Sequence, residues 1–276
     1  MADIISINKV KQEFPLKFSV CTIVNDRTEY DIMQKIFEEK GFTDGCEYMI
    51  ADNTETNNFD AFQSISSFLK NAKGEYIIIV HQDIRLIDDR NKLEFCLQEL
   101  TEKDSKWAIC GNAGAKGYHQ SVLHIAHKNH TELSKDLPVK VNSLDENFLV
   151  IRAASNITIS PDLKGFHLYG TDLCIIARFL GYTCYVIEFL MLHLSEGNIS
   201  SLKEHEKDFL AKYGQKMNVG YIQTTCTQFY LSNSKFKNRL LNSPFFFFIM
   251  KQFVRYPFLV NKWRSKKEKR REIIKT

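Results

Sequence analysis

Hydrophobic runs of strand length alternate along the first part of the chain with segments whose hydrophobic residues recur at helical spacing. The run Tyr76–Val80 contains three consecutive isoleucines and is followed by the polar triplet His81-Gln82-Asp83. An uninterrupted run of this kind predicts a strand buried on both faces, in a sheet covered by helices. Because ligands bind beyond the carboxyl ends of such strands, we expect Asp83 at a binding crevice. The alternative is that the triplet is simply a polar turn.

Two strands and two helices are predicted before this run. The strands are Phe18–Val24 and Glu47–Ala51, and each ends in polar residues. The helices are marked by hydrophobic residues at helical spacing, namely Ile32, Met33, Ile36 and Phe37 in the first and Phe59, Phe62, Ile65 and Leu69 in the second. Strands and helices that alternate with short connections predict an α/β domain with a doubly wound, mostly parallel sheet.

The middle of the chain is less regular. Further elements are predicted from the same patterns, namely strands at Trp107–Cys110, Phe148–Ile151 and Tyr185–Phe189 and helices over Leu93–Leu100 and Leu173–Leu180. The stretch Ala115–Pro138 is expected to be a long polar loop. It contains four histidines whose spacing matches no zinc-binding pattern, namely His119, His124, His127 and His130.

The C-terminal part has a different character, so we divide the chain into a domain of residues 1–232 and an extension of residues 233–276. Pro244–Met250 is strongly apolar but far shorter than the roughly 20 residues that span a bilayer. Lys262–Thr276 contains eight basic and two acidic residues, whereas the preceding 261 residues contain 29 basic and 31 acidic ones. Aromatic residues beside a basic block are typical of segments that lie at an anionic membrane surface, although a solvated basic tail is the alternative.

Composition and missing motifs exclude several classes of protein. The seven cysteines form no Cys-x-x-Cys pair, which favours reduced thiols in a cytosol. Met1–Phe14 lacks the apolar core of a secretory signal, so export by that route is not expected. The sequence contains neither a Gly-x-Gly-x-x-Gly motif nor a phosphate-binding Gly-x-x-x-x-Gly-Lys-[Ser/Thr] loop. The slightly acidic body argues against a nucleic-acid partner.

Four polar signals follow one another along the chain, each beside a predicted strand or helix. They are Asp52-Asn53, His81-Gln82-Asp83, Asp145 before Phe148, and Gly165–Cys174 followed by His193-Leu194-Ser195. In their order and spacing the chain resembles the GT-A-fold glycosyltransferases, and in particular the inverting family-two-like branch with His-Gln-Asp in place of Asp-x-Asp. The resemblance covers Lys17 to Asn198. It implies a GT-A-like (Rossmann-like), mostly parallel sheet with helices on both faces, followed by a C-terminal helical extension.

The resemblance also implies residue roles. Asp83 and His193 would bind Mn²⁺ or Mg²⁺, and Asp172 would be the general base. Asp52 would help to hold the nucleotide base, and Asp145 would contact the donor sugar. Further contacts with the nucleotide are implied for Thr22, Val24, Asn25, Asn53 and His81. His81 stands where the usual motif has its first aspartate, so the ribose contacts of that motif are not carried over.

Each of these residues has a simpler interpretation. Asp172 would serve equally well as a helix N-cap, and His193 as a partly buried histidine bonded to a backbone carbonyl. Asp52-Asn53 and Asp145 are common turn residues.

The function that follows is metal-dependent, inverting transfer of a sugar from a nucleotide-sugar donor, which the resemblance implies is a UDP-sugar. Negative charge builds up on the departing diphosphate, and a cation held by Asp83 would stabilise it. The acceptor would be a glycan or a lipid-linked glycan in polysaccharide biosynthesis, with the histidine-rich loop on the acceptor side. We expect a cytoplasmic location, peripheral at the inner membrane face through the C-terminal tail.

Two other functions remain open. A sugar-nucleotide nucleotidyltransferase would need a glycine-rich basic loop after the first strand, which Asn25-Asp26-Arg27-Thr28 does not provide. A non-catalytic module that binds membranes or polyanions through the basic tail would show no effect of nucleotide or metal.

Overall fold

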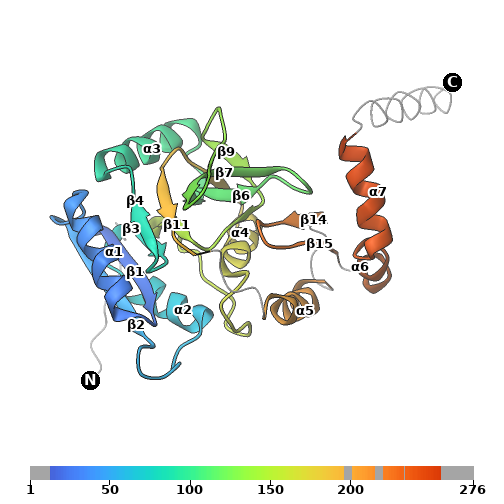
Figure 1. Cartoon of the computed structure of the whole chain (residues 1–276), viewed down its shortest axis with the longest axis horizontal. Helices are drawn as coiled ribbons and strands as arrows, with labels where there is room; N and C mark the ends of the chain where they lie inside the picture. Colours follow the sequence, from blue (N-terminus) through green and yellow to red (C-terminus); the bar gives the residue numbers. More distant parts are fainter. Residues whose placement is uncertain (1–12, 196–200, 215–219, 233, 256–276) are drawn as a thin grey trace, which may run out of the picture.

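The three strands predicted first along the chain form one side of a seven-stranded sheet (Figure 1). The computed structural model describes residues 13–195, 201–214, 220–232 and 234–255. In spatial order the strands of this sheet are β2 (Cys46–Asp52), β1 (Leu16–Val24), β3 (Gly74–Val80), β11 (Phe148–Arg152), β5 (Trp107–Gly111), β12 (Thr183–Val186) and β9 (Val139–Val141). The predicted α/β class is confirmed.

The sheet is mixed. β1 runs parallel to β2 and β3, and β12 runs parallel to β5. β11 lies between β3 and β5 and is antiparallel to both, and β9 is antiparallel to β12. A strand that is buried on both faces is apolar throughout, whether it runs parallel or antiparallel to its neighbours. The sequence of β11 therefore does not indicate the direction in which it pairs.

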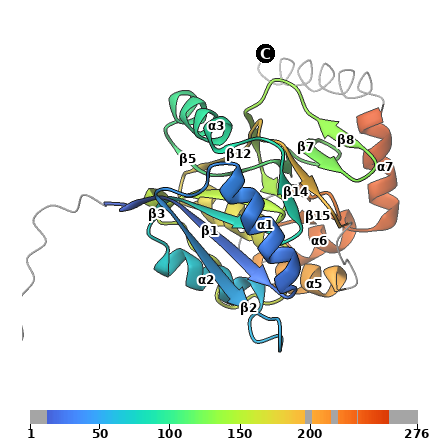
Figure 2. The same cartoon turned by 60° about the vertical axis from the view of Figure 1, so that its left-hand side comes forward.

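Helices cover both faces of this sheet, as expected (Figure 2). Along β3, Ile77 and Ile79 pack in one core and Ile78 and Val80 in the other, following the two-residue period of a strand. α1 and α3 pack on the Ile78 side, and α2, α4 and α5 on the Ile77 side. These helices are α1 (Arg27–Glu39), α2 (Ala61–Asn71), α3 (Arg90–Lys103), α4 (Tyr169–Phe179) and α5 (Leu202–Tyr213).

Helix boundaries correct some details of the predicted faces. In α1 the buried residues are Tyr30, Met33 and Phe37, and Ile32 is exposed. Phe59, predicted on the apolar face of the second helix, precedes the capping box formed by Asp60 and Gln63 and is exposed.

A second sheet lies beyond the carboxyl ends of β1 and β3. Its strands in spatial order are β10 (Ser143–Leu144), β6 (Ala113–Ala115), β7 (Ser121–His127), β13 (Met191–His193) and β4 (Ile84–Leu86), with β8 (Thr131–Leu133) paired to β7. The prediction of a polar loop over Ala115–Pro138 is therefore wrong. β7 buries Val122, Ile125 and Ala126, but strands as short as β6 and β8 show too few residues to reveal a period.

A hairpin of β14 (Gly220–Gln223) and β15 (Gln228–Leu231) precedes the C-terminal extension, which contains α6 (Lys235–Leu241) and α7 (Pro244–Arg255). Among the described residues, none of the helices combines the length and apolar character needed to span a bilayer. The basic block Lys262–Thr276 lies outside the described residues.

Gly74 offers a test of how closely β1 and β3 approach each other. A Cβ at this position would lie 2.5 Å from the backbone nitrogen of Ser19, whereas at Gly117 no atom lies within 4 Å. We expect Gly74→Ala to lower the free energy of unfolding by about 1–3 kcal/mol, because a backbone contact must open. Gly117→Ala is the matched control and should change it by less than about 0.5 kcal/mol. Equal denaturation midpoints for the two variants would contradict this packing.

Candidate functional site

A cleft of about 960 Å³ lies between the carboxyl ends of β1 and β3 and the second sheet. This volume is in the range of pockets that bind small molecules. Six of the residues predicted to form the site line the cleft, namely Asn25, Asn53, His81, Asp83, Asp145 and His193. Segments more than 100 residues apart in the sequence therefore meet in one place.

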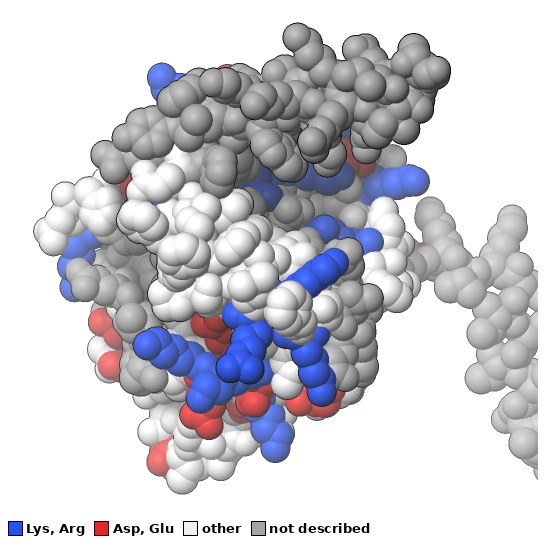
Figure 3. All heavy atoms as spheres, turned by 90° about the vertical axis from the view of Figure 1, so that its right-hand side faces the viewer, with Lys and Arg blue, Asp and Glu red and all other residues white. Residues whose placement is uncertain are grey.

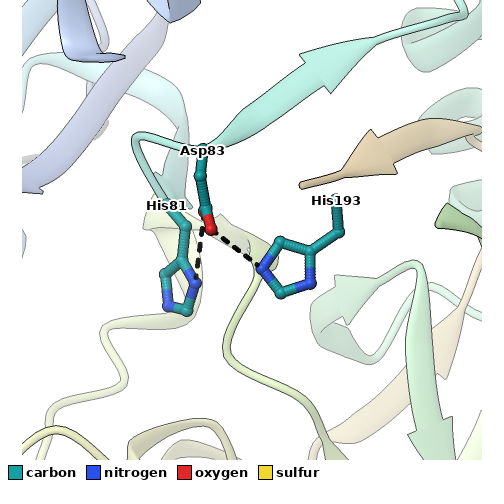
Figure 4. Close-up of side chains that lie close together, drawn as sticks. All are labelled: His81, Asp83 and His193. Carbon is teal, nitrogen blue, oxygen red and sulfur yellow. Dashed lines mark ion pairs between the residues drawn. The ribbon is translucent and has the colours of Figure 1, made fainter. Parts of the chain in front are cut away.

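Strand pairing brings Asp83 and His193 together. Asp83 immediately precedes β4, and β13 pairs antiparallel with β4 so that His193 lies opposite Ile84. The backbone N–H of Leu194 donates to the carbonyl of Asp83 at 3.2 Å. The Oδ2 atom of Asp83 lies 3.4 Å from Nε2 of His193, and its Oδ1 atom lies 4.0 Å from Nδ1 of His81 (Figure 4).

These three side chains are suited to hold a divalent cation. Their ligand atoms lie within 4.8 Å of one another. Burial acts to raise the pKa of Asp83, but hydrogen bonds from His193 and Ser195 outweigh it and hold the pKa below its ordinary value. Burial lowers the pKa of His81 despite the opposing effect of Asp83. An ionised carboxylate and a neutral imidazole are the forms that bind metal.

Tyr169 orients the His81 ring. Its hydroxyl donates to the carbonyl of Glu146 at 3.0 Å and lies 2.9 Å from Nε2 of His81. With its proton on the Glu146 side, this hydroxyl accepts from Nε2–H, which leaves the lone pair of Nδ1 facing Asp83. Metal-binding histidines typically donate their second N–H in this way. The sequence contained no signal for the role of Tyr169.

Gln82 joins the ends of β1 and β3. Its Oε1 atom accepts from the backbone N–H of Asn25 at 3.0 Å and from that of Asp26 at 3.1 Å. Its amide group also donates to the Asn25 side chain. The middle residue of the triplet therefore positions the two strand ends, and Asn25 is partly occupied by this contact.

Two adjacent acids complete the cleft wall, and only the first was predicted. Asp145 accepts from the backbone N–H of Thr225 at 3.2 Å, and burial raises its pKa. Burial, together with the charge of Asp145, raises the pKa of Glu146 to about 8, although backbone N–H groups of Gly170 and Leu168 oppose the shift. One carboxylate oxygen of Glu146 is buried without a partner in the described structure. The adjacent acid pair before an apolar strand was the available sequence signal.

Asp172 does not lie in the cleft, so the structure does not support its prediction as the general base. Its side chain is fully buried in α4. Its oxygens accept from the Ser160 backbone N–H at 2.8 Å, from the Ser160 hydroxyl at 2.7 Å and from the Tyr213 hydroxyl. The alternative role as a helix N-cap is wrong, because the N-cap residue of α4 is Leu168.

Of the predicted residues at the ends of β1 and β2, Asn53 lines the cleft, and Asp52, Thr22 and Val24 do not. Asp52 is exposed and accepts from the backbone N–H and hydroxyl of Thr54, which lower its pKa. Asn53 is buried and both accepts from and donates to the backbone of Phe59. Thr22 and Val24 are buried within β1 and do not line the cleft. Asp52 therefore has the contacts of a turn residue and Val24 lies in the core, whereas the buried Thr22 hydroxyl has no hydrogen-bond partner among the described residues.

Comparison with known proteins places the chain in a family. No family model matches it. The protein "ATP synthase subunits region ORF 6" of Fuscovulum blasticum is 39% identical over 192 residues, which are 66% of this chain and 77% of that protein. The chain belongs to the family of this protein. The relative's name states no activity.

Solved structures with similar arrangements have low sequence identity. S. aureus TarS 1–349 in complex with UDP-GlcNAc is 12% identical, with a TM-score of 0.47 over 66% of this chain and 60% of TarS 1–349. The mannosyltransferase PcManGT from Pyrobaculum calidifontis, in complex with GDP-Man and Mn²⁺, is 10% identical, with a TM-score of 0.47 over 72% and 65%. A197 from STIV is 12% identical, with a TM-score of 0.41 over 79% and 95%. At these values no ligand or activity is carried over to this chain.

We expect Asp172→Ala to destabilise the fold. The substitution leaves the buried donors of Ser160 and Tyr213 without an acceptor, which costs about 1–3 kcal/mol. Ser160→Ala should also lower the free energy of unfolding. Because the two residues share hydrogen bonds, the double variant should lose less than the sum of the two changes. Urea denaturation measures all three variants, and an unchanged or raised stability of Asp172→Ala would contradict the structural role.

Proposed function

We propose that this protein is a metal-dependent glycosyltransferase that transfers a sugar from a nucleotide-sugar donor, with UDP-sugar as the first donor to test. The observation that carries the proposal is the convergence of Asp83, His81 and His193 in one cleft beyond the strand ends. The order of the polar signals along the chain, which resembles that of GT-A-fold enzymes, supports the same function.

Asp83, with His193 and His81, is the proposed holder of Mn²⁺ or Mg²⁺ and through it of the donor diphosphate. Imidazole nitrogen beside a carboxylate favours manganese over magnesium. When bound, such a cation would neutralise charge on the departing diphosphate. Tyr169 keeps the His81 ring in the required tautomer, and Gln82 keeps the two strand ends together. These two residues position the ligands and need not touch the substrate.

The general base of an inverting transfer is assigned to the acid pair of the cleft wall. An acceptor hydroxyl must lose its proton as it attacks, and a carboxylate can take it. Glu146 lines the cleft, and burial together with the charge of Asp145 raises the pKa of its carboxyl group to about 8. Its ionised form is therefore a stronger base than an ordinary glutamate, although it is the minor form at neutral pH. Asp145, bound to the Thr225 backbone, is assigned to donor contact, as the resemblance implied.

The C-terminal extension supports an acceptor at a membrane, such as a lipid-linked glycan. Over residues 235–252, α6 and α7 contain no acidic residue and four basic ones, namely Lys235, Lys237, Arg239 and Lys251. Phe236, Phe245 and Phe248 on these helices are 74%, 73% and 63% exposed. On this side the molecule has a broad uncharged area, bordered below by Lys and Arg with Asp and Glu beside them (Figure 3). Apolar and basic groups together favour an anionic bilayer surface.

α7 is anchored beside the second sheet. The Tyr118 hydroxyl, from the loop between β6 and β7, donates to the carbonyl of Phe247 at 2.8 Å, and the two rings stack with centroids 5.7 Å apart. The surface of α6 and α7 is therefore held close to the elements that line the cleft.

Asp83 provides the test of the proposed function. UDP should raise the Tm of the wild-type protein when Mn²⁺ is present and much less without it, because binding to the native state adds stability. At a UDP concentration about 100 times Kd the gain is about 2.7 kcal/mol. Asp83→Asn should lose this Mn²⁺-dependent shift. Asp31→Asn, an exposed acid on α1, is the control and should keep it. An Mn²⁺-dependent UDP shift that survives in Asp83→Asn would reject the metal role of Asp83.

The same screen separates the alternatives. A Tm shift with nucleoside triphosphate and sugar phosphate but not with nucleoside diphosphate would favour a nucleotidyltransferase. No response to any nucleotide, with or without metal, would favour a non-catalytic module.

Replacement of exposed aromatic residues tests the membrane surface. The wild-type chain should sediment with vesicles that contain anionic phospholipid, and less so as salt is raised. The double variant Phe245→Glu, Phe248→Glu should bind at least about tenfold more weakly, because each inserted phenylalanine contributes about 1.5–3 kcal/mol. Phe179→Glu, at an exposed aromatic on α4, is the matched control. Equal sedimentation of the wild-type protein and the double variant would contradict the proposed surface.

A further inference from the structure

A second group of metal-binding side chains lies in the same cleft, on the hairpin of β7 and β8. The Nε2 atoms of His127 and His130 lie 3.9 Å and 3.8 Å from the same oxygen of Glu132. Ligand atoms of the three residues all lie within 4.8 Å of one another, and all three line the cleft. We propose that His127, His130 and Glu132 form a second cation site, separate from Asp83, that takes a zinc-like transition metal.

Hairpin geometry explains why these residues face the same way. The backbone N–H of His127 donates to the carbonyl of His130 at 2.7 Å, so the two residues face each other across a tight turn. Glu132 lies opposite Ile125, and alternate residues of a strand point to the same face. His127 and Ile125 therefore share a face with His130 and Glu132. The two imidazole rings stack with centroids 4.6 Å apart.

The distances match ligands around a cation better than they match hydrogen bonds. Separations of 3.8 Å and 3.9 Å are longer than N–H···O hydrogen bonds of about 2.7–3.2 Å. Zinc–nitrogen and zinc–oxygen bonds measure about 2.0–2.2 Å, so the ligand atoms of a tetrahedral zinc site lie about 3.3–3.6 Å from one another. The separations of 3.8 Å and 3.9 Å exceed that spacing by only a few tenths of an ångström. Small side-chain movements would therefore complete the coordination.

The ligand set indicates the class of metal. Two imidazoles and one carboxylate are a common set of protein ligands for zinc. In such sites the fourth coordination position holds a water or the substrate, and here it would face the cleft. The Asp83 group has the same donor types, but its side chains are less exposed than those of His130 and Glu132.

Strand order places the two groups side by side. β13 lies between β4 and β7, and His193 pairs with Ile84 on one side and His127 on the other. The rings of His127 and His193 have centroids 6.2 Å apart. A metal bound at the hairpin would thus face the same cleft as the Asp83 cluster, from the wall that the second sheet forms. The inference does not depend on the proposed transfer reaction.

Metal stoichiometry tests this proposal without an activity assay. Tag-free, full-length protein is dialysed to equilibrium against Zn²⁺, and Co²⁺ replaces Zn²⁺ for visible absorption spectra. The wild-type chain should bind two equivalents. Glu132→Gln and His130→Asn should each lose one equivalent and retain the other, whereas Asp83→Asn should lose the other one. The combined Glu132→Gln, Asp83→Asn variant should lose both.

Lys128→Ala, in the exposed turn of the same hairpin, is the control and should bind like the wild-type protein. Glu132→Gln and His130→Asn with wild-type stoichiometry and spectra would overturn the second site. So would a single equivalent in the wild-type chain that Asp83→Asn alone removes. If the UDP test fails while the hairpin variants still lose one equivalent, the proposed function fails and the second site stands.

Discussion

The pairing of β13 with β4 is the constraint on which the candidate site depends. His193 is 110 residues from Asp83, and only the register that sets His193 opposite Ile84 brings the two side chains together. A shift of one residue would turn His193 to the other face of the sheet. The hydrogen bond from Leu194 N–H to the backbone carbonyl of Asp83 extends the pairing to the residue that carries the carboxylate. Since β13 also pairs with β7, the same register determines the distance between both groups of metal-binding side chains.

Rigid, apolar support surrounds this polar cluster. β3 is packed from both sides, so the triplet at its end begins from a strand with little freedom to move. Gln82 then ties that end to β1, and Tyr169 ties His81 to the Glu146 carbonyl. The contacts of Tyr169 also satisfy polar groups that would otherwise lie unpaired in a partly buried position, which is costly. The ligands are thus held by neighbours whose own partners are satisfied.

The elements with strong periodicity were predictable from the sequence. β1, β3, α2 and α3 have long apolar patterns whose residues are buried, whereas β2, at the edge of the sheet, buries only Ala51. The direction of β11 and the second sheet were not predictable, because their strands are short and pair with distant segments. Asp83 was predicted at a crevice from its position after a buried strand, and His193 and Asp145 were predicted through the resemblance. The structure brings all three to one cleft. Tyr169 and Glu146 were missed, since their roles arise from tertiary contacts.

Asp172 shows why residue type and spacing do not by themselves assign a role. It lies one turn inside α4, on a side that packs against Ser160 and Tyr213. The beginning of that helix packs so tightly on β10 that a Cβ at Gly170 would lie 2.5 Å from the Leu144 carbonyl oxygen. No side chain at Gly170 could therefore reach the cleft from the helix. The N–H groups at the start of α4 instead approach Glu146, on the loop after β10, and lower a pKa that burial raises. The two adjacent acids of the cleft wall, Asp145 and Glu146, are thus supplied by the loop after β10, whereas α4 contributes Tyr169.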